Sequence, residues 1–232
     1  QSMACNIAET GVPVINYATK IQGFVTGIVV TSIITVIYPQ MAKLVEEEAT
    51  EELAHVFGRS LSLMAALVLP ATVGVVAFHE EIVRLLFQGG AFSAEDVAVT
   101  GKVLLFYGLG FLAIGIREIG IRIFYSKKMA TVPVINSVYM VVLNIFLNVV
   151  LGKIFGLRGL AMGTLVALWV GGMGMLLHLK KSMKTLGLRE YRINLAKILF
   201  ASIAMGLAAK WTEGFLLSHL SSNLSLIIAI AA

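Results

Sequence analysis

Long apolar stretches separated by short charged segments make up most of the chain. Allowing about twenty apolar residues for each crossing of a bilayer, we expect six complete membrane spans, at residues 20–41, 58–79, 101–125, 131–152, 158–180 and 194–212. Long apolar runs and only four prolines favour helices, whereas the strands of a membrane barrel alternate apolar and polar residues over about ten positions. The pattern therefore predicts an all-α, polytopic transmembrane helix bundle.

The segments outside these spans predict three further features. Residues 80–90 place Ile82, Leu85 and Leu86 on one side and then reach two glycines, which is typical of a short helix lying in the membrane interface. We expect residues 1–19 to form a loop that follows a preceding helix outside this sequence, and residues 223–232 to begin a further, truncated helix. The chain is thus expected to be one part of a longer protein. Within the second span, Pro70 predicts a kink, because proline removes a backbone donor.

Composition supports a membrane protein and excludes several other classes. The chain is 58% hydrophobic and 13% charged, with a mean hydropathy of +0.91, far from the averages of soluble domains. The net charge of +5 would suggest nucleic-acid binding only if the basic residues shared one soluble face, and here they lie between spans. Cys5 is the single cysteine, and the sequence has no metal-binding motif, no Gly-rich phosphate loop and no catalytic triad pattern. We expect no enzyme activity, no metal site, no cofactor and no nucleic-acid partner.

Lysine and arginine residues predict the orientation of the spans. If the loop at residues 42–58 is cytoplasmic, eleven of these residues lie near span ends on that side and five on the other. Basic residues near span ends are enriched on the cytoplasmic side of a membrane. We therefore expect residues 126–128 and 180–192 to be cytoplasmic, and the interfacial segment to face outward.

Three charged residues lie inside the third span. Glu118 and Arg122 are four residues apart with the acid first, a spacing that favours an ion pair on one helix face. Arg117 lies about 12 Å along a helix from Tyr125, which is near the cytoplasmic end. An arginine in the middle of a bilayer costs at least about 2.5 kcal/mol, so its side chain has to face protein or water. Two environments meet that need: a polar cavity that accepts an anionic group, or a buried carboxylate partner.

Polar residues in two other spans are further candidates. Asn136, Asn144 and Asn148 share one face of the fourth span by their spacing. They predict either hydrogen bonds between helices or a polar wall of the same cavity. Lys20 begins the first span, where a lysine usually anchors a helix at the interface.

Four segments together resemble one known family. They are INYATKIQGFVTGIVVTSIITVIYPQMAK at 15–43, LLFQGGAFSAEDVAVTGKVLLFYGLG at 85–110, RIFYSKKMATVP at 122–133 and GLRGLAMGT at 156–164. They resemble the second half of MurJ/MviN proteins, the lipid II flippases of the multidrug/oligosaccharidyl-lipid/polysaccharide exporter superfamily. The resemblance implies one lobe of a two-lobed, fourteen-helix transporter with a central cationic cavity. It also implies a groove for a polyprenyl tail between the last two helices.

The resemblance changes the interpretation of Lys20. At this position, after tyrosine, alanine and one variable residue, the family has an arginine that lines the cavity and handles the lipid-linked pyrophosphate. Lys20 is accordingly expected to be a cavity cation, acting as a point charge rather than a bidentate fork. The candidate substrate-binding set is Lys20, Arg117, Glu118, Arg122, Asn144 and Asn148.

The expected function is a flippase for a lipid-linked oligosaccharide, with lipid II as the substrate implied by the family, working by alternating access. Its partners would be the polyprenyl-pyrophosphate-linked saccharide, membrane lipid and an N-terminal lobe of the same protein, in the bacterial cytoplasmic membrane. An ion gradient or the membrane potential would drive it. Two alternatives remain open: a drug/cation antiporter of the same superfamily, which would use embedded carboxylates, and a non-transporting membrane scaffold.

Overall fold

The computed structural model describes residues 2–89, 92–183, 186 and 188–217, and nearly all of them are helical. The elements in chain order are α1 (Ser2–Val25), the π-helical turn η1 (Thr26–Val30), α2 (Thr31–Glu46), α3 (Thr50–Phe87), α4 (Ala94–Gly108), α5 (Phe111–Ser126), α6 (Thr131–Phe155), α7 (Leu157–Met183) and α8 (Leu188–Leu217). Over these residues the only β-type pairing is an isolated bridge between Gly89 and Phe92. The expected all-α bundle is confirmed.

The described helices supply five membrane crossings, or six if one bent pair of helices is a single span. Five stretches are long and apolar enough to span a membrane: 13–46, which runs from α1 through α2, and then α3, α6, α7 and the 191–215 part of α8. Helices α4 and α5 meet at a 42° bend and pass the same test together, and they agree with the expected third span if they form one crossing. The chain is therefore an integral, multi-pass membrane protein.

The N-terminal segment differs from the expected loop. Residues 2–19 belong to α1, which continues without interruption into η1 and α2. Gly11 and Pro13 read as helix breakers in isolation, yet Val14 and Ala18 are buried, and a methyl group on Gly11 would lie 2.7 Å from Leu157 of α7. Packing against neighbouring helices outweighs the weak local propensity. The expected further helix at 223–232 lies outside the described residues.

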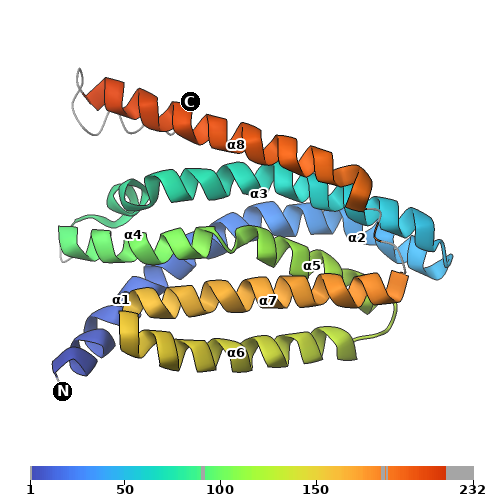
Figure 1. Cartoon of the computed structure of the whole chain (residues 1–232), viewed down its shortest axis with the longest axis horizontal. Coiled ribbons are helices and arrows are strands. Elements are labelled where there is room, and N and C mark those ends of the chain that lie inside the picture. The colour runs from blue at the N-terminus through green and yellow to red at the C-terminus, as the bar shows by residue number, and fades with distance from the viewer. Residues whose placement is uncertain (1, 90–91, 184–185, 187, 218–232) are drawn as a thin grey trace.

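The departure from helical geometry in α3 does not occur at the proline. Helical dihedral angles continue past Pro70, and the non-helical residue is Phe78, with φ −125° and ψ 26°. Residues 79–87 then continue α3 in a new direction, as Figure 1 shows. The location of this last part of α3 in the membrane interface stays a prediction.

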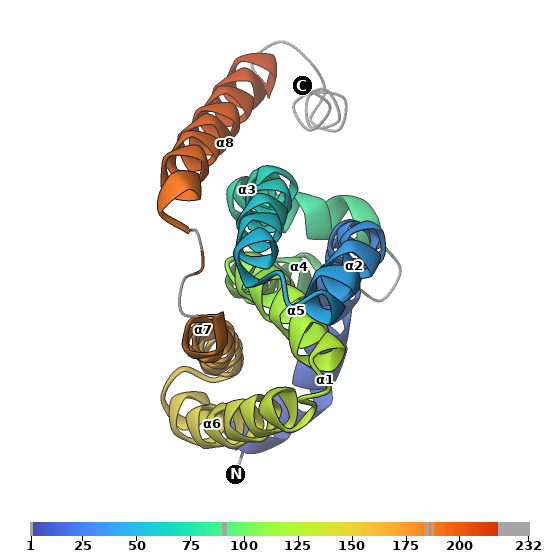
Figure 2. The ribbon, with the colours of Figure 1, turned by 90° about the vertical axis from the view of Figure 1, so that its right-hand side faces the viewer.

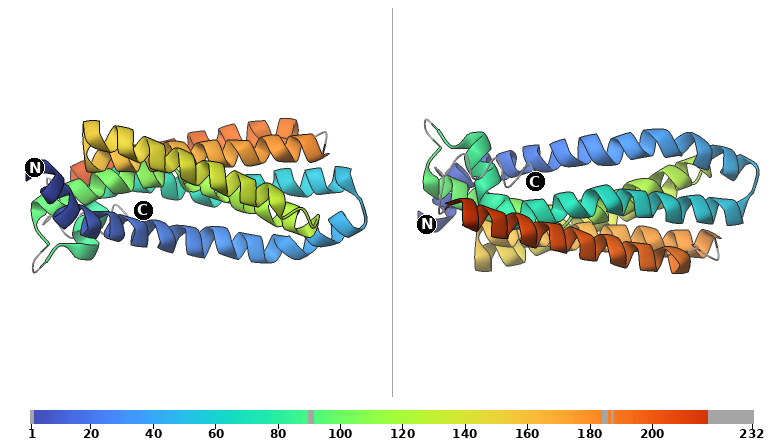
Figure 3. Two further views of the ribbon diagram at one scale, coloured as in Figure 1. Left: turned by 90° about the horizontal axis from the view of Figure 1, so that it is seen from below. Right: turned by 90° about the horizontal axis from the view of Figure 1, so that it is seen from above.

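The connections alternate between the two ends of the bundle. The α2–α3 turn, the α5–α6 turn, the end of α7 and the start of α8 lie at the right-hand end of Figure 1, whereas the α3–α4 and α6–α7 connections lie at the left-hand end. Figure 3 shows the same separation from two other sides. The count of basic residues placed the loops at 42–58, 126–128 and 180–192 on one side of the membrane, and the structure has their described residues at one end. The same count predicts that the right-hand end is cytoplasmic.

Helices α6 and α8 lie at opposite edges of the bundle, as Figure 2 shows. Helix α6 packs chiefly on α7, and α8 packs chiefly on α3. The α6–α7 pair is close because α7 presents glycines: a methyl group on Gly163 would lie 2.5 Å from the Asn148 side chain, and one on Gly159 would collide with the Leu151 carbonyl. Small residues commonly allow membrane helices to approach in this way.

Candidate functional site

Arg117 is held between three helices rather than exposed to lipid. It lies on α5, its Nε donates to Asn136 Oδ1 over 3.3 Å, and its Nη2 donates to the Ser137 hydroxyl over 2.6 Å, both on α6. A methyl group on Gly171 of α7 would lie 3.7 Å from the Arg117 side chain. The Arg117 side chain is 17% exposed. Protein groups therefore compensate much of the cost of placing this guanidinium in a span.

Glu118 is shared by two arginines. Its Oε1 lies 3.6 Å from Arg117 Nη1, and its Oε2 lies 4.0 Å from Arg122 Nη2. The expected pair of Glu118 and Arg122 is present, but Glu118 lies closer to Arg117. Arg122 also lies 5.9 Å from the ring of Tyr38 on α2, a cation–π distance. Its Nε is buried and has no hydrogen-bond partner. The three charges thus form a row along α5 between α6 and α2, with a net charge of +1.

Asn136 links the charged row to α7. It is fully buried, and its Oδ1 accepts from Arg117 while its Nδ2 donates to the Gly171 carbonyl over 3.0 Å. The same amide group also contacts the Tyr139 hydroxyl. Both N–H groups of its side-chain amide are thus engaged, and its Oδ1 accepts one bond. For Asn136 the interpretation as a hydrogen bond between helices is confirmed.

The other two asparagines, Asn144 and Asn148, form a second polar cluster about two and three turns further along α6. Asn144 Nδ2 donates to Thr164 Oγ1 on α7 over 3.2 Å, and Asn148 Nδ2 donates to Asn144 Oδ1 over 3.1 Å. Asn148 Oδ1 is buried without a hydrogen-bond partner. These residues face α7 rather than lipid. An unpaired acceptor at this depth is costly, and it leaves this cluster with spare capacity for a donor or a cation.

Lys20 lies on α1, apart from the α5 row. Its side chain is exposed, and its Nζ is 5.4 Å from the ring centre of Tyr17. The same surface continues past η1 with the exposed positions Gly23, Gly27 and Thr31. Phe24 and Ile28, which lie beside these positions, are also exposed, and Lys20 is the residue of this surface that is costly to place against lipid. The structure does not bring Lys20 into contact with the other candidate residues.

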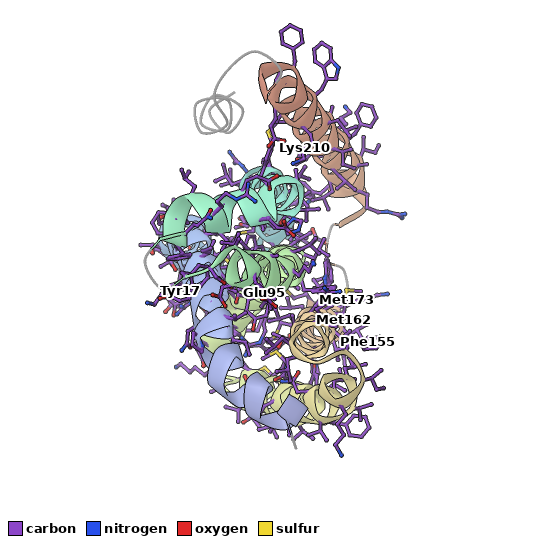
Figure 4. All side chains as sticks on the ribbon, turned by 90° about the vertical axis from the view of Figure 1, so that its left-hand side faces the viewer. Tyr17, Glu95, Phe155, Met162, Met173 and Lys210 are labelled. Carbon is purple, nitrogen blue, oxygen red and sulfur yellow. The ribbon has the colours of Figure 1, made fainter. Side chains whose placement is uncertain are left out.

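One ionic cluster was missed by reasoning from the sequence. Lys210 Nζ on α8 lies 3.0 Å from Glu81 on α3 and 2.9 Å from Glu213. It also lies 4.7 Å from the ring centre of Phe78, beside the break in α3. Figure 4 shows Lys210 on the side of α8 that faces α3. Glu213 is 6% exposed. The bundle therefore contains a further carboxylate within a membrane span, besides that of Glu118. The spacing of Lys210 and Glu213, three residues apart, was the one available signal.

An apolar groove of about 690 Å³ separates α8 from α7. Its walls come from α3, α7, α8 and the α4–α5 junction, and include Val73, Trp169 and Leu199, with Lys210 at one end. Trp169 donates its indole N–H to the Leu109 carbonyl over 3.1 Å, which fixes the ring in the wall. Such a surface can accommodate a long hydrocarbon chain.

Fold and site together define a multi-pass helical membrane protein with charged and amide side chains inside its bundle, a combination typical of membrane transporters. The model of one family, described as lipid II flippase MurJ, matches residues 1–230. The chain belongs to the MurJ lipid II flippase family.

Individual relatives agree with this assignment. The chain is 32% identical over 165 residues to a protein of Rhizobium meliloti (strain 1021) named "Probable lipid II flippase MurJ", covering 71% of this chain and 31% of the relative. A protein of the same name from Rhizobium tropici is 25% identical over 232 residues, covering 96% and 44%. The solved structure of "Lipid II flippase MurJ, inward closed conformation" matches the fold with a TM-score of 0.73 and 22% identity, covering 95% of this chain and 45% of that one. The chain thus spans less than half the length of these proteins.

Proposed function

We propose that this chain forms one lobe of a flippase that moves lipid II, a lipid-linked saccharide, across the bacterial cytoplasmic membrane for peptidoglycan synthesis. The observation that carries the proposal is the family match over residues 1–230. Membership in a transporter family also agrees with the absence of a catalytic motif in the sequence. The second lobe, the substrate and the membrane location are parts of this proposal.

Lys20 is proposed to bind the pyrophosphate of the substrate. Its exposed position on α1 supports this role, since the helices of this chain leave that surface of α1 and α2 open. In a transporter with a second lobe, this surface would face the central cavity. A lysine offers an anion a compact, hydrated point charge.

The α5 row is proposed to form the part of the cavity wall next to α6. Arg117, Glu118 and Arg122 are all partly exposed, and their net positive charge suits an anionic substrate. Asn144 and Asn148 would extend the polar wall along α6. The apolar groove beside α8 is proposed to hold part of the polyprenyl tail, so that the tail stays in apolar surroundings while the headgroup crosses.

Alternating access supplies the proposed mechanism. The lobe would rock as a body against its partner, so that Lys20 meets the cytoplasmic and the outer side in turn. An ion gradient or the membrane potential is proposed as the drive, since 100 mV does about 2.3 kcal/mol of work on each charge moved across the membrane. No cofactor takes part in this scheme.

The antiporter alternative is weakened by the pairing of the acidic residues. Cation antiport needs embedded carboxylates that can bind a proton or metal ion. Among the described residues, the candidates Glu118, Glu213 and Glu81 each lie within ion-pair distance of a lysine or arginine. The interior is therefore better suited to anions.

The test is substitution of Lys20 in the full-length protein. We expect Lys20→Ala to abolish most lipid II translocation in proteoliposomes, and Lys20→Arg to retain it, at normal protein levels. Lys43→Ala is the matched control, because Lys43 is exposed on α2 and forms a surface ion pair with Glu47. Wild-type translocation by Lys20→Ala would overturn the site assignment, and loss of assembly without a transport defect in the remaining protein would favour a scaffold.

A further inference from the structure

A second groove, of about 710 Å³, lies on the other side of the α3–α8 contact and is lined by α2, α3 and α8. Unlike the apolar groove, it has polar side chains from all three helices: Gln40, Arg59, Ser60, Ser62, Asn194 and Lys197. Its remaining lining is aliphatic and includes Val36 and Leu63. The groove therefore combines a polar part with an apolar part.

The polar residues lie at the level where each helix changes from charged to apolar sequence. Gln40 precedes the charged end of α2, Arg59 follows the acidic start of α3, and Lys197 follows the basic start of α8. Such changes mark the boundary between headgroups and hydrocarbon. The groove thus opens at the headgroup level of the leaflet next to the α2–α3 turn, which the charge count predicts to be cytoplasmic.

Arg59 and Lys197 give the groove two cations without acidic partners. Both side chains are exposed, and no carboxylate among the described residues forms an ion pair with either one. Basic residues at the cytoplasmic surface are attracted to anionic lipids, with about 1 kcal/mol for each residue. The charge of the groove therefore complements a lipid phosphate.

Ser62 supplies an independent sign of a missing ligand. Ser62 lines the groove, and its hydroxyl is buried and has no hydrogen-bond partner. Ser60, two residues earlier, instead donates to the Val56 carbonyl over 2.6 Å and is satisfied. A buried hydroxyl without a partner is uncommon in native structures. A phosphate or glycerol oxygen in the groove would satisfy Ser62.

We propose that this groove binds an anionic phospholipid of the adjacent leaflet, with its phosphate between Arg59 and Lys197 and its acyl chains against Val36 and Leu63. The lipid would bridge α8 to α2 and α3 and hold α8 in place. This inference concerns a membrane lipid and does not depend on the proposed transport function.

The test is lipid binding to the full-length protein, measured by native mass spectrometry with phosphatidylglycerol and phosphatidylcholine of identical acyl chains. We expect the wild type to retain phosphatidylglycerol preferentially. The double variant Arg59→Ala, Lys197→Ala is expected to lose that preference by at least about tenfold in affinity. Lys180→Ala, Lys181→Ala is the matched control, because it removes two charges near the same end of the bundle but outside the groove.

Three outcomes would overturn the assignment: no preference in the wild type, an equal loss in the control variant, or displacement of phosphatidylglycerol by equimolar polyprenyl diphosphate. The last result would assign the groove to the lipid-linked substrate. Ser62→Ala keeps the test informative if the double variant is unstable, since we expect it to weaken binding by several-fold without altering charge. Added phosphatidylglycerol should also raise the melting temperature of the wild type more than that of either groove variant.

Discussion

Arg117 of α5 donates a 2.6 Å hydrogen bond to the hydroxyl of Ser137 on α6, and that hydroxyl donates in turn to the Pro133 carbonyl in the preceding turn over 2.9 Å. The guanidinium is thereby tied to the start of α6. Few other contacts join α5 and α6, so this bond and the one to Asn136 are the main links between these two helices.

Removing the acceptor should loosen that link. We expect Ser137→Ala to destabilise the full-length protein by about 1–2 kcal/mol, the range seen for hydrogen bonds between membrane helices in model peptides. Thermal unfolding in detergent measures the effect. Ser182→Ala is the control, because Ser182 accepts a bond of 2.9 Å from Lys127 in an exposed setting and should cost less than about 0.5 kcal/mol. Equal shifts for the two variants would contradict the assigned role.

Paired substitution distinguishes a structural role for Arg117 from a role in transport. Arg117→Ala leaves Glu118 with only the 4.0 Å contact to Arg122, so we expect lower protein levels as well as lower translocation. The double variant Arg117→Ala, Glu118→Ala removes both charges and should restore part of the protein level, because the Arg117 bonds to α6 stay lost. Translocation should stay low if Arg117 also lines the substrate path. Recovery of both quantities would show that the pair serves only to hold the helices.

Substitution of glycine by alanine should change stability in opposite directions at Gly163 and Gly74, because their surroundings differ. Gly163→Ala would bring a methyl group to 2.5 Å from Asn148 Oδ1, so we expect a destabilisation of about 1–3 kcal/mol. Gly74→Ala meets nothing within 4 Å and should be neutral or stabilise α3 by up to about 1 kcal/mol. Melting temperatures of the two variants give the comparison. A similar loss for both would mean that α6 and α7 do not rely on close approach.

Replacing Lys210 should lower the stability of the protein, because the buried carboxylate of Glu213 would lose its ion-pair partner. Lys210→Met leaves Glu213 buried without its partner, and we expect a loss of about 1.5 kcal/mol, the lower end for bonds to charged groups because Lys210 is 45% exposed. Adding Glu213→Gln to this variant should recover part of the loss. The exposed pair of Lys43 and Glu47 supplies the control, since Lys43→Met should change stability by less than about 0.5 kcal/mol. Limited proteolysis of α8 offers a second measurement, because α8 packs chiefly on α3.

Much of this architecture can be predicted from hydrophobic length and charge spacing. The all-helical bundle, the shared end of three connections and the neighbouring positions of Glu118 and Arg122 follow from the length, charge and spacing of residues along the chain. The partners of Arg117 and Asn136 do not, because they depend on which helices become neighbours. Spacing put Asn136 on the right face but could not show that the Gly171 carbonyl lies opposite it.

Two features of the fold that differ from or go beyond the sequence expectations have the same physical origin. The helical state of residues 2–19 depends on burial of Val14 and Ala18 against other helices, which outweighs the local effect of Pro13. The break in α3 occurs at Phe78, where no proline or glycine marks it, and beside it Lys210 of α8 packs over the aromatic ring. Tertiary contacts decided both features.

The π-helical turn Thr26–Val30 rotates the side chains of α2 about the helix axis relative to those of α1, within one continuous helix. Its wide hydrogen bond from the Thr31 N–H to the Thr26 carbonyl inserts one residue into the helical repeat. Lys20 and Tyr38 are eighteen residues apart, five whole turns in a regular helix, and would then point in the same direction. The inserted residue rotates them apart by about 100°. One continuous span can therefore present Lys20 on an open surface while Tyr38 turns toward Arg122 of α5.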